Sequence, residues 1–487
     1  MDEIDDRRIA EWIAILTFVV YAYSFGGGGW NQNSQFDLTR AIVEGHTLAI
    51  DAYATNTGDV SYAHGHIYSN KSPALSWIAA IPYAALYAAE RASGIDVSAA
   101  MPLTFNAYIC SLITVALPGA LIPAMLFVIG RRRGFDRSWC AFVALATAFA
   151  TQLFPYSTLF MLHVPSGALM LYALTSPRRG LAGFAAGLAT AMNYLCAPAI
   201  VFFAFVNPVE DRTLSVLHWK RFIIAAFVPL IVLAAYQQIC FGSFLTNSMA
   251  RTDPRFVTPG ATAGVFQAPS VRVLYAITVS PYRGVFFFAP LLIAAIGGAI
   301  IWWRTRADRT DLYAIIAIAA FFFGFNLFFN GWDAGFGVGG RYLVPVIPLA
   351  GLLLLHFRGP LTIALAVLSF AINLAATVVD PQPSGTIPRP LTQYILPLLS
   401  TGHFSPKVPI TPPWSAATFT GHTSVNRMTF DEARVFERHA PGSLEAEWTS
   451  FNLGEPVFGA GAAASIAPLL LILAGGCSAI AMKIRRT

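Results

Sequence analysis

Residues 105–130 read FNAYICSLITVALPGALIPAMLFVIG and lead directly into three arginines, Arg131, Arg132 and Arg133. A stretch of this length without a formal charge is long enough to cross the hydrocarbon core of a membrane as a helix. The sequence therefore predicts an all-α polytopic membrane protein with about 11–13 transmembrane helices. Similar apolar segments lie near residues 9–25, 73–90, 138–156, 158–176, 181–206, 221–241, 284–303, 311–329, 342–357, 360–379 and 459–482.

The composition agrees with this prediction. Of the 487 residues, 56% are hydrophobic and only 11% are charged, and the mean hydropathy is +0.60. In a typical soluble protein, about one quarter of all residues are charged. The composition therefore excludes a soluble enzyme, a disordered protein and a nucleic-acid binder. Long continuous apolar runs are also not typical of an outer-membrane barrel, whose strands alternate in polarity.

Basic clusters follow several of the apolar segments and predict the orientation of the chain. The positive-inside rule places these clusters on the cytoplasmic side, so the net charge of +6 is mainly a topology signal. We expect a bacterial inner-membrane protein whose long polar loops face the outside. The clusters are Arg131 to Arg133, Arg178 and Arg179, Lys220 and Arg221, Arg304 to Arg309, and Lys483 to Arg486.

Two apolar segments do not fit a single membrane crossing. If the N-terminus and Arg131 are both inside, residues 26–104 contain no net crossing, so residues 73–90 lie along the interface or dip in and return. A misplaced N-terminus is the alternative explanation. Residues 181–206 are too long for one span and are interrupted by Asn193, Tyr194 and Pro198, which predicts two short helices.

Three polar regions are expected on the outer face, namely 26–72, 241–283 and 380–458. We expect residues 1–379 to form the transmembrane catalytic domain, 380–458 an extracytoplasmic subdomain, and 459–487 a final transmembrane helix with a basic tail. Prolines crowd the start of the second unit, between Pro381 and Pro413, and predict an irregular backbone. Further on, Thr429 and Glu432 form a capping-box pattern ahead of a short helix.

The first polar loop holds the candidate general base. Asp37 follows a glycine run within about one helical turn of the predicted membrane surface, where partial desolvation raises a carboxylate pKa toward neutrality. The alternative is that Asp37 caps a helix that starts just after it, LTRAIVEG. Asp59, in TNTGD, is interpreted as a turn residue. Asp51 is a candidate for substrate binding, and His64 and His66 are weak metal candidates.

Three basic residues fall at membrane edges on the expected outer side, against the positive-inside bias. They are Lys71 in YSNKSP, Arg283 in SPYRG and Arg341 in GVGGRY. An anionic partner such as a lipid-linked phosphate would explain them, and snorkelling to lipid headgroups is the alternative. For Arg341 the glycines before it favour the first explanation, because they let the backbone approach a ligand closely. His163 opens an apolar helix at the same face and is therefore a further candidate for substrate binding.

The ordered set of these elements resembles the GT-C glycosyltransferases, polytopic enzymes that use polyprenyl-phosphate sugars. The protein O-mannosyltransferase and aminoarabinose-transferase branch is the nearest match, over roughly residues 10–360. The elements are NSQFDLTRAIVEG, YSNKSPALS, LFPYSTLFMLH, LAGFAAGLATAMNYLCAP, SPYRGVFFFAP and GVGGRYLVPVIP.

The resemblance implies a catalytic base at Asp37 and a phosphate-binding lysine at Lys71. It also implies phosphate and sugar contacts from Arg283, Arg341 and Tyr342. The second outer loop carries His163 and no acid, which puts a metal-dependent mechanism in doubt. The five cysteines show no metal-ligand spacing either.

The predicted function is transfer of a sugar from a polyprenyl-phosphate donor to a hydroxyl of a glycan, lipid or protein. We expect transfer on the outer face, with inversion and without metal or other cofactor. Two other classes share the spans and stay open at this point. A lipid-linked sugar flippase or an O-antigen ligase or polymerase would not need Asp37, and a membrane scaffold would need neither Asp37 nor Arg341.

Overall fold

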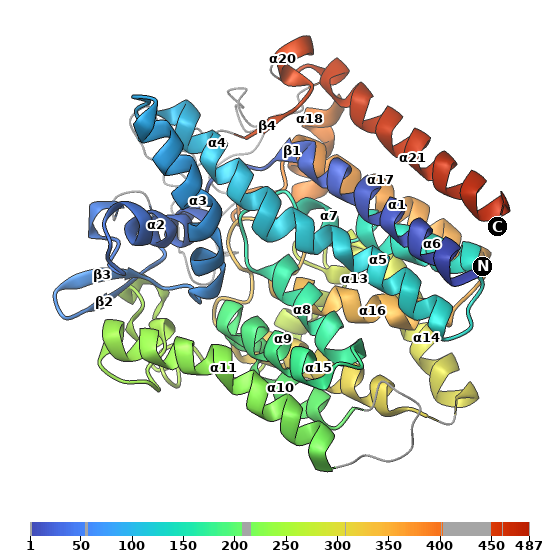
Figure 1. The fold of residues 1–487 in the computed structure, drawn as a ribbon, viewed down its shortest axis with the longest axis horizontal. Coiled ribbons are helices and arrows are strands. Elements are labelled where there is room, and N and C mark those ends of the chain that lie inside the picture. Colours follow the sequence, from blue (N-terminus) through green and yellow to red (C-terminus); the bar gives the residue numbers. More distant parts are fainter. Residues whose placement is uncertain are drawn as a thin grey trace.

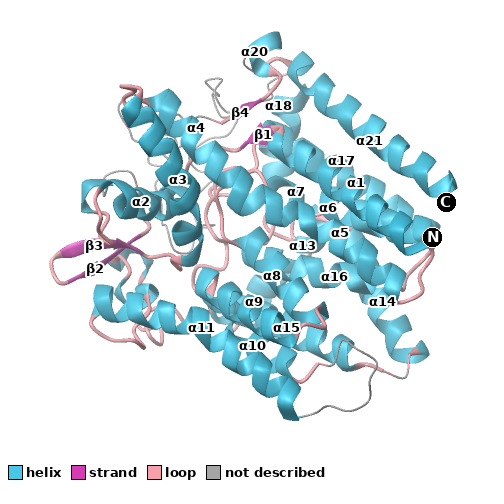
Figure 2. Cartoon of the chain, in the orientation of Figure 1, coloured by secondary structure: helices cyan, strands magenta, loops and turns pink. Residues whose placement is uncertain are grey.

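The computed structural model describes residues 2–53, 57–206, 216–306, 308–400, 402, 450–459 and 461–486. The described chain is almost entirely helical, with two small antiparallel sheets of two strands each (Figures 1 and 2). It is an all-α polytopic membrane protein, as the sequence predicts. The proposed capping box at Thr429 and Glu432 lies outside the described residues.

Five helices are long and apolar enough to cross a membrane, within the described ranges. The first runs over Met101–Arg132, because α4 (Ala100–Ser111) continues through a π-helical turn into α5 (Leu117–Arg132). The others are Trp219–Phe241 within α11 (Val216–Phe241), α15 (Thr310–Phe328), α17 (Pro360–Val379) and Ala463–Arg486, which includes α21 (Ala467–Arg486).

Several segments predicted as full spans form shorter helices. The segment near 138–156 gives α6 (Arg137–Phe149) and the single turn α7 (Leu153–Tyr156), and the next gives α8 (His163–Thr175). The backbone turns between them at buried polar residues such as Thr151 and Gln152. Further helices, besides those described in the next paragraphs, are α1 (Asp2–Ala22), α12 (Val271–Thr278), α13 (Val285–Phe288), α14 (Leu291–Thr305), α16 (Ile347–Leu354), α18 (Leu396–Ser400) and α20 (Glu455–Phe458).

The predicted break within 181–206 is confirmed. Helix α9 (Arg179–Met192) ends before Asn193, whose side chain accepts a hydrogen bond from the Leu195 N–H at 3.2 Å. A short 3-10 turn then leads into α10 (Ala197–Ala204). Helix α9 packs closely on α11 through Gly183 and Gly187. A Cβ atom at these positions would come within 1.9 and 2.2 Å of α11 carbonyl oxygens, so only glycine permits this contact.

Ion pairs show which helix ends lie together at one end of the bundle. Asp6 in α1 pairs with Arg131 at 2.9 Å and with Arg137 at 2.6 Å. The N-terminal helix therefore starts at the same end of the bundle as the arginine cluster 131–133, which confirms that residues 26–104 make no net crossing. We call this the basic end. Arg133 also pairs there with Asp311, at the start of α15.

The first loop folds at the opposite end of the bundle (Figure 1). It consists of α2 (Trp30–Glu44), the hairpin of β2 (Val60–Ala63) and β3 (His66–Ser69), and α3 (Ala74–Ala92). Helix α3 packs against α2, with the rings of Phe36 and Tyr83 5.2 Å apart. We call this the cleft end, for the cleft described below.

Two segments from the C-terminal part of the chain lie at the cleft end. The backbone from 381 to 389 is irregular, as its prolines predict. After the gap in the described residues, β4 (Phe451–Asn452) pairs with β1 (Ser24–Phe25), directly after α1. Helix α21 then packs along α1 toward the basic end.

Candidate active site

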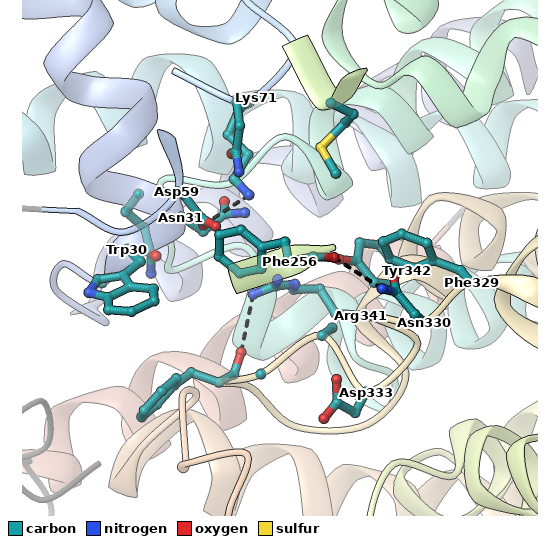
Figure 3. Close-up of a pocket in the computed structure, with 18 of the residues that line it drawn as sticks. Trp30, Asn31, Asp59, Lys71, Phe256, Phe329, Asn330, Asp333, Arg341 and Tyr342 are labelled. Carbon is teal, nitrogen blue, oxygen red and sulfur yellow. Dashed lines mark hydrogen bonds and ion pairs between the residues drawn. The ribbon is translucent and has the colours of Figure 1, made fainter. Parts of the chain in front are cut away.

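A polar cleft opens between five parts of the chain at the cleft end (Figure 3). Its empty volume, including the part open to solvent, is about 680 Å³. The walls are the start of α2, the residues that flank the β2–β3 hairpin, the segment 249–265, the loop 329–342, and Gln382. These parts are up to 350 residues apart, as the 2.5 Å hydrogen bond from Gln32 Nε2 to Gln382 Oε1 shows.

Lys71 lies in this cleft and pairs with Asp59, with 2.9 Å between Nζ and Oδ2. Their side chains are 15% and 12% exposed, so the pair is largely withdrawn from water. The two residues flank the hairpin, and the Asn70 N–H donates to the Asp59 carbonyl at 3.2 Å. Asp59, interpreted from the sequence as a turn residue, is therefore a carboxylate of the cleft.

Arg341 faces the same cleft from the other wall. Its Nη1 donates to the Phe336 carbonyl oxygen at 3.2 Å, and its residue is only 7% exposed. Its Nε atom is buried and has no hydrogen-bond partner among the described residues. An unsatisfied charged donor in a buried position is costly, which makes it available to a ligand acceptor.

Lys71 and Arg341 influence each other electrostatically. Burial lowers the pKa of Lys71, the Asp59 carboxylate opposes this change, and the Arg341 guanidinium lowers the pKa further. Two cations that repel each other across a cleft are typical of a site that binds an anion, because the anion relieves the repulsion.

Tyr342 also lines the cleft, and His163 supports it from behind. The rings of His163 and Tyr342 meet edge to face at 6.0 Å, and the Arg341 guanidinium lies 5.6 Å from the Tyr342 ring centre. His163 is 3% exposed and is not among the residues that line the cleft. It opens α8, as predicted, but its place indicates a packing contact with Tyr342 rather than substrate binding.

Arg283 differs from its predicted role as a phosphate contact. It is 1% exposed, and its guanidinium donates to the carbonyl oxygens of Asp333, at 3.0 Å, and of Gly335 and Gly337. All three donor nitrogens are used in holding the loop whose other face lines the cleft. Arg283 is therefore a positioning residue, because its guanidinium binds backbone carbonyl oxygens of the protein itself.

Replacing Arg283 with methionine is expected to destabilise the protein. Three buried carbonyl oxygens would lose a charged donor, and such a hydrogen bond contributes about 1.5–3 kcal/mol. The free energy of unfolding should fall by more than about 3 kcal/mol, measured as a lower melting temperature in detergent. The matched control is Arg255→Met, whose side chain is 55% exposed. Equal melting temperatures of the two variants would contradict the positioning role.

Asp37, the predicted general base, lies elsewhere. It is fully buried in the middle of α2, whose N-cap is Gly29, so the alternative that it caps a helix is wrong. Asn31 and Gln32 of the same helix line the cleft, whereas Asp37 does not. Asp37 lies six positions after Asn31 on the helix, a distance of about 9 Å along the axis. The carboxylates that line the cleft are instead those of Asp59 and Asp333.

Asp51 also lies outside the cleft. Its carboxylate pairs with His66 Nδ1 at 2.7 Å and accepts a hydrogen bond from the Ile67 N–H at 2.7 Å. Both side chains are about half exposed, at 45% and 57%. These contacts join β3 to the segment before the hairpin, and the substrate contact of Asp51 stays a prediction. His64 occupies the hairpin turn, with a positive φ of 52°.

Several cleft residues were missed from the sequence. Asp333 is 3% exposed and lies in the cleft with its neighbours Ala334 and Gly335. Three amide side chains, those of Gln32, Asn70 and Asn330, have buried oxygen atoms without a partner among the described residues. In the sequence, the available signal for Asp333 is its place in the loop GWDAGFGVGG, which ends directly before Arg341. The amides give no signal in a single sequence, because Asn and Gln are common in loops.

The fold and cleft define a helical membrane protein with cations and carboxylates gathered at one end of its bundle. No family model and no curated protein matches the chain. Two solved structures of ArnT from Cupriavidus metallidurans are similar. The apo structure shows 15% identity and a TM-score of 0.43, over 89% of this chain and 74% of ArnT. The structure bound to undecaprenyl phosphate shows 14% identity and a TM-score of 0.45, over 90% and 75%.

Proposed function

We propose that this protein is a membrane glycosyltransferase that moves a sugar from a polyprenyl-phosphate donor to an acceptor hydroxyl at the cleft end. One observation carries the proposal. The cleft brings together two cations, Lys71 and Arg341, with two carboxylates, Asp59 and Asp333, from segments far apart in the sequence. Cations suit a phosphate leaving group, and a carboxylate suits proton removal from a hydroxyl.

Lys71 and Arg341 bind the phosphate of the donor. The unpartnered Nε of Arg341 offers a charge-assisted hydrogen bond to a phosphate oxygen. Lys71 offers a compact charge that can turn from Asp59 to the phosphate when the donor arrives. As the bond between the sugar and the phosphate breaks, negative charge grows on the phosphate, and both cations stabilise it.

Asp59 is the base in this proposal, in place of Asp37. When Lys71 turns to the phosphate, the Asp59 carboxylate is released from its 2.9 Å ion pair and can accept a proton. The acceptor hydroxyl gives its proton to Asp59, and its oxygen forms a bond to the anomeric carbon. The carbon–oxygen bond to the phosphate breaks, and polyprenyl phosphate leaves with the electron pair. A single displacement of this kind inverts the anomeric configuration.

The amide side chains suit the sugar. Buried oxygen atoms of Gln32, Asn70 and Asn330 lack partners among the described residues, and each can accept a hydrogen bond from a hydroxyl group. If these acceptors receive hydrogen bonds only when a sugar is bound, the cleft binds a polyhydroxylated ligand more tightly than an apolar one. The acceptor is a hydroxyl of a glycan, lipid or protein on the outer side of the membrane.

The test uses the purified full chain in liposomes with a labelled polyprenyl-phosphate sugar and an envelope extract as acceptor. Transfer of label together with release of polyprenyl phosphate, and a product of inverted anomeric configuration, is the expected result. Movement of intact donor across the bilayer without release of polyprenyl phosphate would instead identify a flippase. A product that keeps the donor's configuration would contradict the single displacement.

Removal of divalent metal is expected to leave transfer unchanged. The leaving phosphate can be balanced by Lys71 and Arg341, so the proposed step needs no metal ion. The measurement is the initial rate of transfer after dialysis against a chelator, with and without added Mg²⁺ or Mn²⁺. Loss of activity that only the metal restores would contradict this expectation and require a metal at the phosphate.

A further inference from the structure

A second cleft lies at the basic end of the bundle. It is lined by residues 177–181 and by Arg221, and its empty volume, including the part open to solvent, is about 740 Å³. Helix α8 connects the two clefts, since it begins at His163, behind Tyr342, and ends at Thr175. A helix of 13 residues is about 20 Å long, so the second cleft is separate from the first.

Helix α9 begins in this second cleft. Its N-cap residue is Arg178, and no side chain of the described residues caps the helix. The first backbone N–H groups of a helix have no acceptor within it, and together with the helix dipole they attract anions. Gly180 lies in this first turn, and the space where its Cβ would stand is open. A ligand can therefore approach the backbone there.

Arg179 has one donor that the described part of the chain leaves without a hydrogen bond, while its guanidinium lies 4.6 Å from the ring centre of Phe222. The residue is 6% exposed and lines the cleft. Its Nη2 donates to the carbonyl oxygens of Phe203 and Ala204 at 2.5 and 3.2 Å, which fixes the guanidinium at the end of α10. Its Nη1 is buried and has no hydrogen-bond partner among the described residues. A buried charged donor normally has a partner.

Among the described residues, the charges that line this cleft have one sign. Arg178 and Arg221 are exposed and line it with Arg179, and no carboxylate of the described ranges does so. Asp311, whose charge reaches Arg179, is itself paired with Arg133. Within the described ranges, neither Arg178 nor Arg221 forms an ion pair. Two exposed guanidinium groups beside a helix start, with a third guanidinium fixed nearby at the end of α10, match the charge of a phosphate group.

We propose that this second cleft binds a phosphate group. Arg178 and Arg221 contact the phosphate from the exposed sides, and the first turn of α9 and Arg179 Nη1 offer donors from below. Two ligands carry this chemistry, namely the headgroup of an anionic phospholipid and free inorganic phosphate. Basic pockets between helices at a membrane surface are suited to the former. The site is separate from the proposed glycosyltransferase cleft and does not depend on that function.

The experiment measures binding to the full chain in a neutral detergent, with two probes used separately. One probe is phosphatidylglycerol, followed by native mass spectrometry, and the other is inorganic phosphate, followed by calorimetry. The cleft variant carries Arg178→Gln and Arg221→Gln, and keeps Arg179 because that residue fixes α10. The control variant carries Arg304→Gln and Arg485→Gln, two exposed arginines outside the cleft, and loses the same charge.

We expect the wild type and the control variant to bind a probe equally, and the cleft variant to bind it at least about tenfold more weakly. Binding of phosphatidylglycerol but not of inorganic phosphate identifies a lipid headgroup, and binding of both identifies a general phosphate site. The proposal is overturned if the wild type binds neither probe. It is equally overturned if both variants weaken binding alike, because the effect would then reflect net charge. Melting curves of both variants verify that they are folded.

Discussion

Glutamine in place of Arg341 is expected to lower the rate of sugar transfer by at least about 100-fold, the effect of removing one preorganised donor from a developing anion. The residue is 7% exposed, and its Nε has no partner among the described residues, so this donor can bind the phosphate while Nη1 keeps its hydrogen bond to Phe336. The loss should therefore fall on kcat, because the phosphate gains most of its charge only as the bond to the sugar breaks.

The controls for Arg341 separate catalysis from folding. Arg341→Lys keeps the charge but loses the planar fork, so it should recover part of the activity. Arg272→Gln removes an exposed arginine of α12 and should transfer sugar like the wild type. Melting temperatures of all three variants are measured in parallel. If Arg341→Gln transfers sugar at the wild-type rate while folded, the assignment of this cleft to the phosphate is wrong.

Asparagine in place of Asp59 is expected to reduce transfer by about 10²- to 10⁴-fold, the usual contribution of a positioned general base. Donor binding should persist, because Lys71 and Arg341 remain. The change also removes the partner of a largely buried lysine, which lowers stability. The double variant Asp59→Asn with Lys71→Gln removes that unpaired charge. It should regain stability without regaining transfer.

Two comparison variants decide which carboxylate acts as the base. Asp37→Asn changes a residue that is buried in α2 and does not line the cleft, so it should transfer sugar at a rate comparable to the wild type. Asp333→Asn changes the other cleft carboxylate. Loss of transfer in Asp333→Asn with near-normal transfer in Asp59→Asn would move the role of base to Asp333. Loss in Asp37→Asn alone would return it to the residue predicted from the sequence.

The sequence predicted part of this site. The positions of Lys71 and Arg341 at membrane edges on the expected outer side, with glycines before Arg341, predict a phosphate site, and the family resemblance adds Tyr342. The structure brings all three into one cleft. The prediction for Asp37 rests on the same resemblance and on its distance from a predicted membrane surface. That distance describes depth in the bilayer, but it does not tell which way a side chain points on a helix. On α2, Asn31 and Gln32 reach the cleft and Asp37 does not.

The roles of Arg283 and Asp59 required the tertiary structure for a similar reason. Both stand in short loops where a charged residue is equally suited to solvent, a ligand or the protein itself. Arg283 turns out to bind the backbone of loop 333–337, and Asp59 pairs with Lys71 across the hairpin. These partners are 50 and 12 residues away in the sequence. Pairing between such segments depends on how helices pack and is not encoded in local spacing.

The sequence by itself determined the helical membrane class, the end of the bundle where the basic clusters gather, and the break at Asn193. Each follows from local physical chemistry: the cost of burying charge, the positive-inside bias and the conformational limits of proline and polar residues. The tertiary structure alone decided which charged residues share a cleft. Residues as distant as Gln32 and Gln382 meet there. Their proximity results from packing among many helices, which no single stretch of sequence specifies.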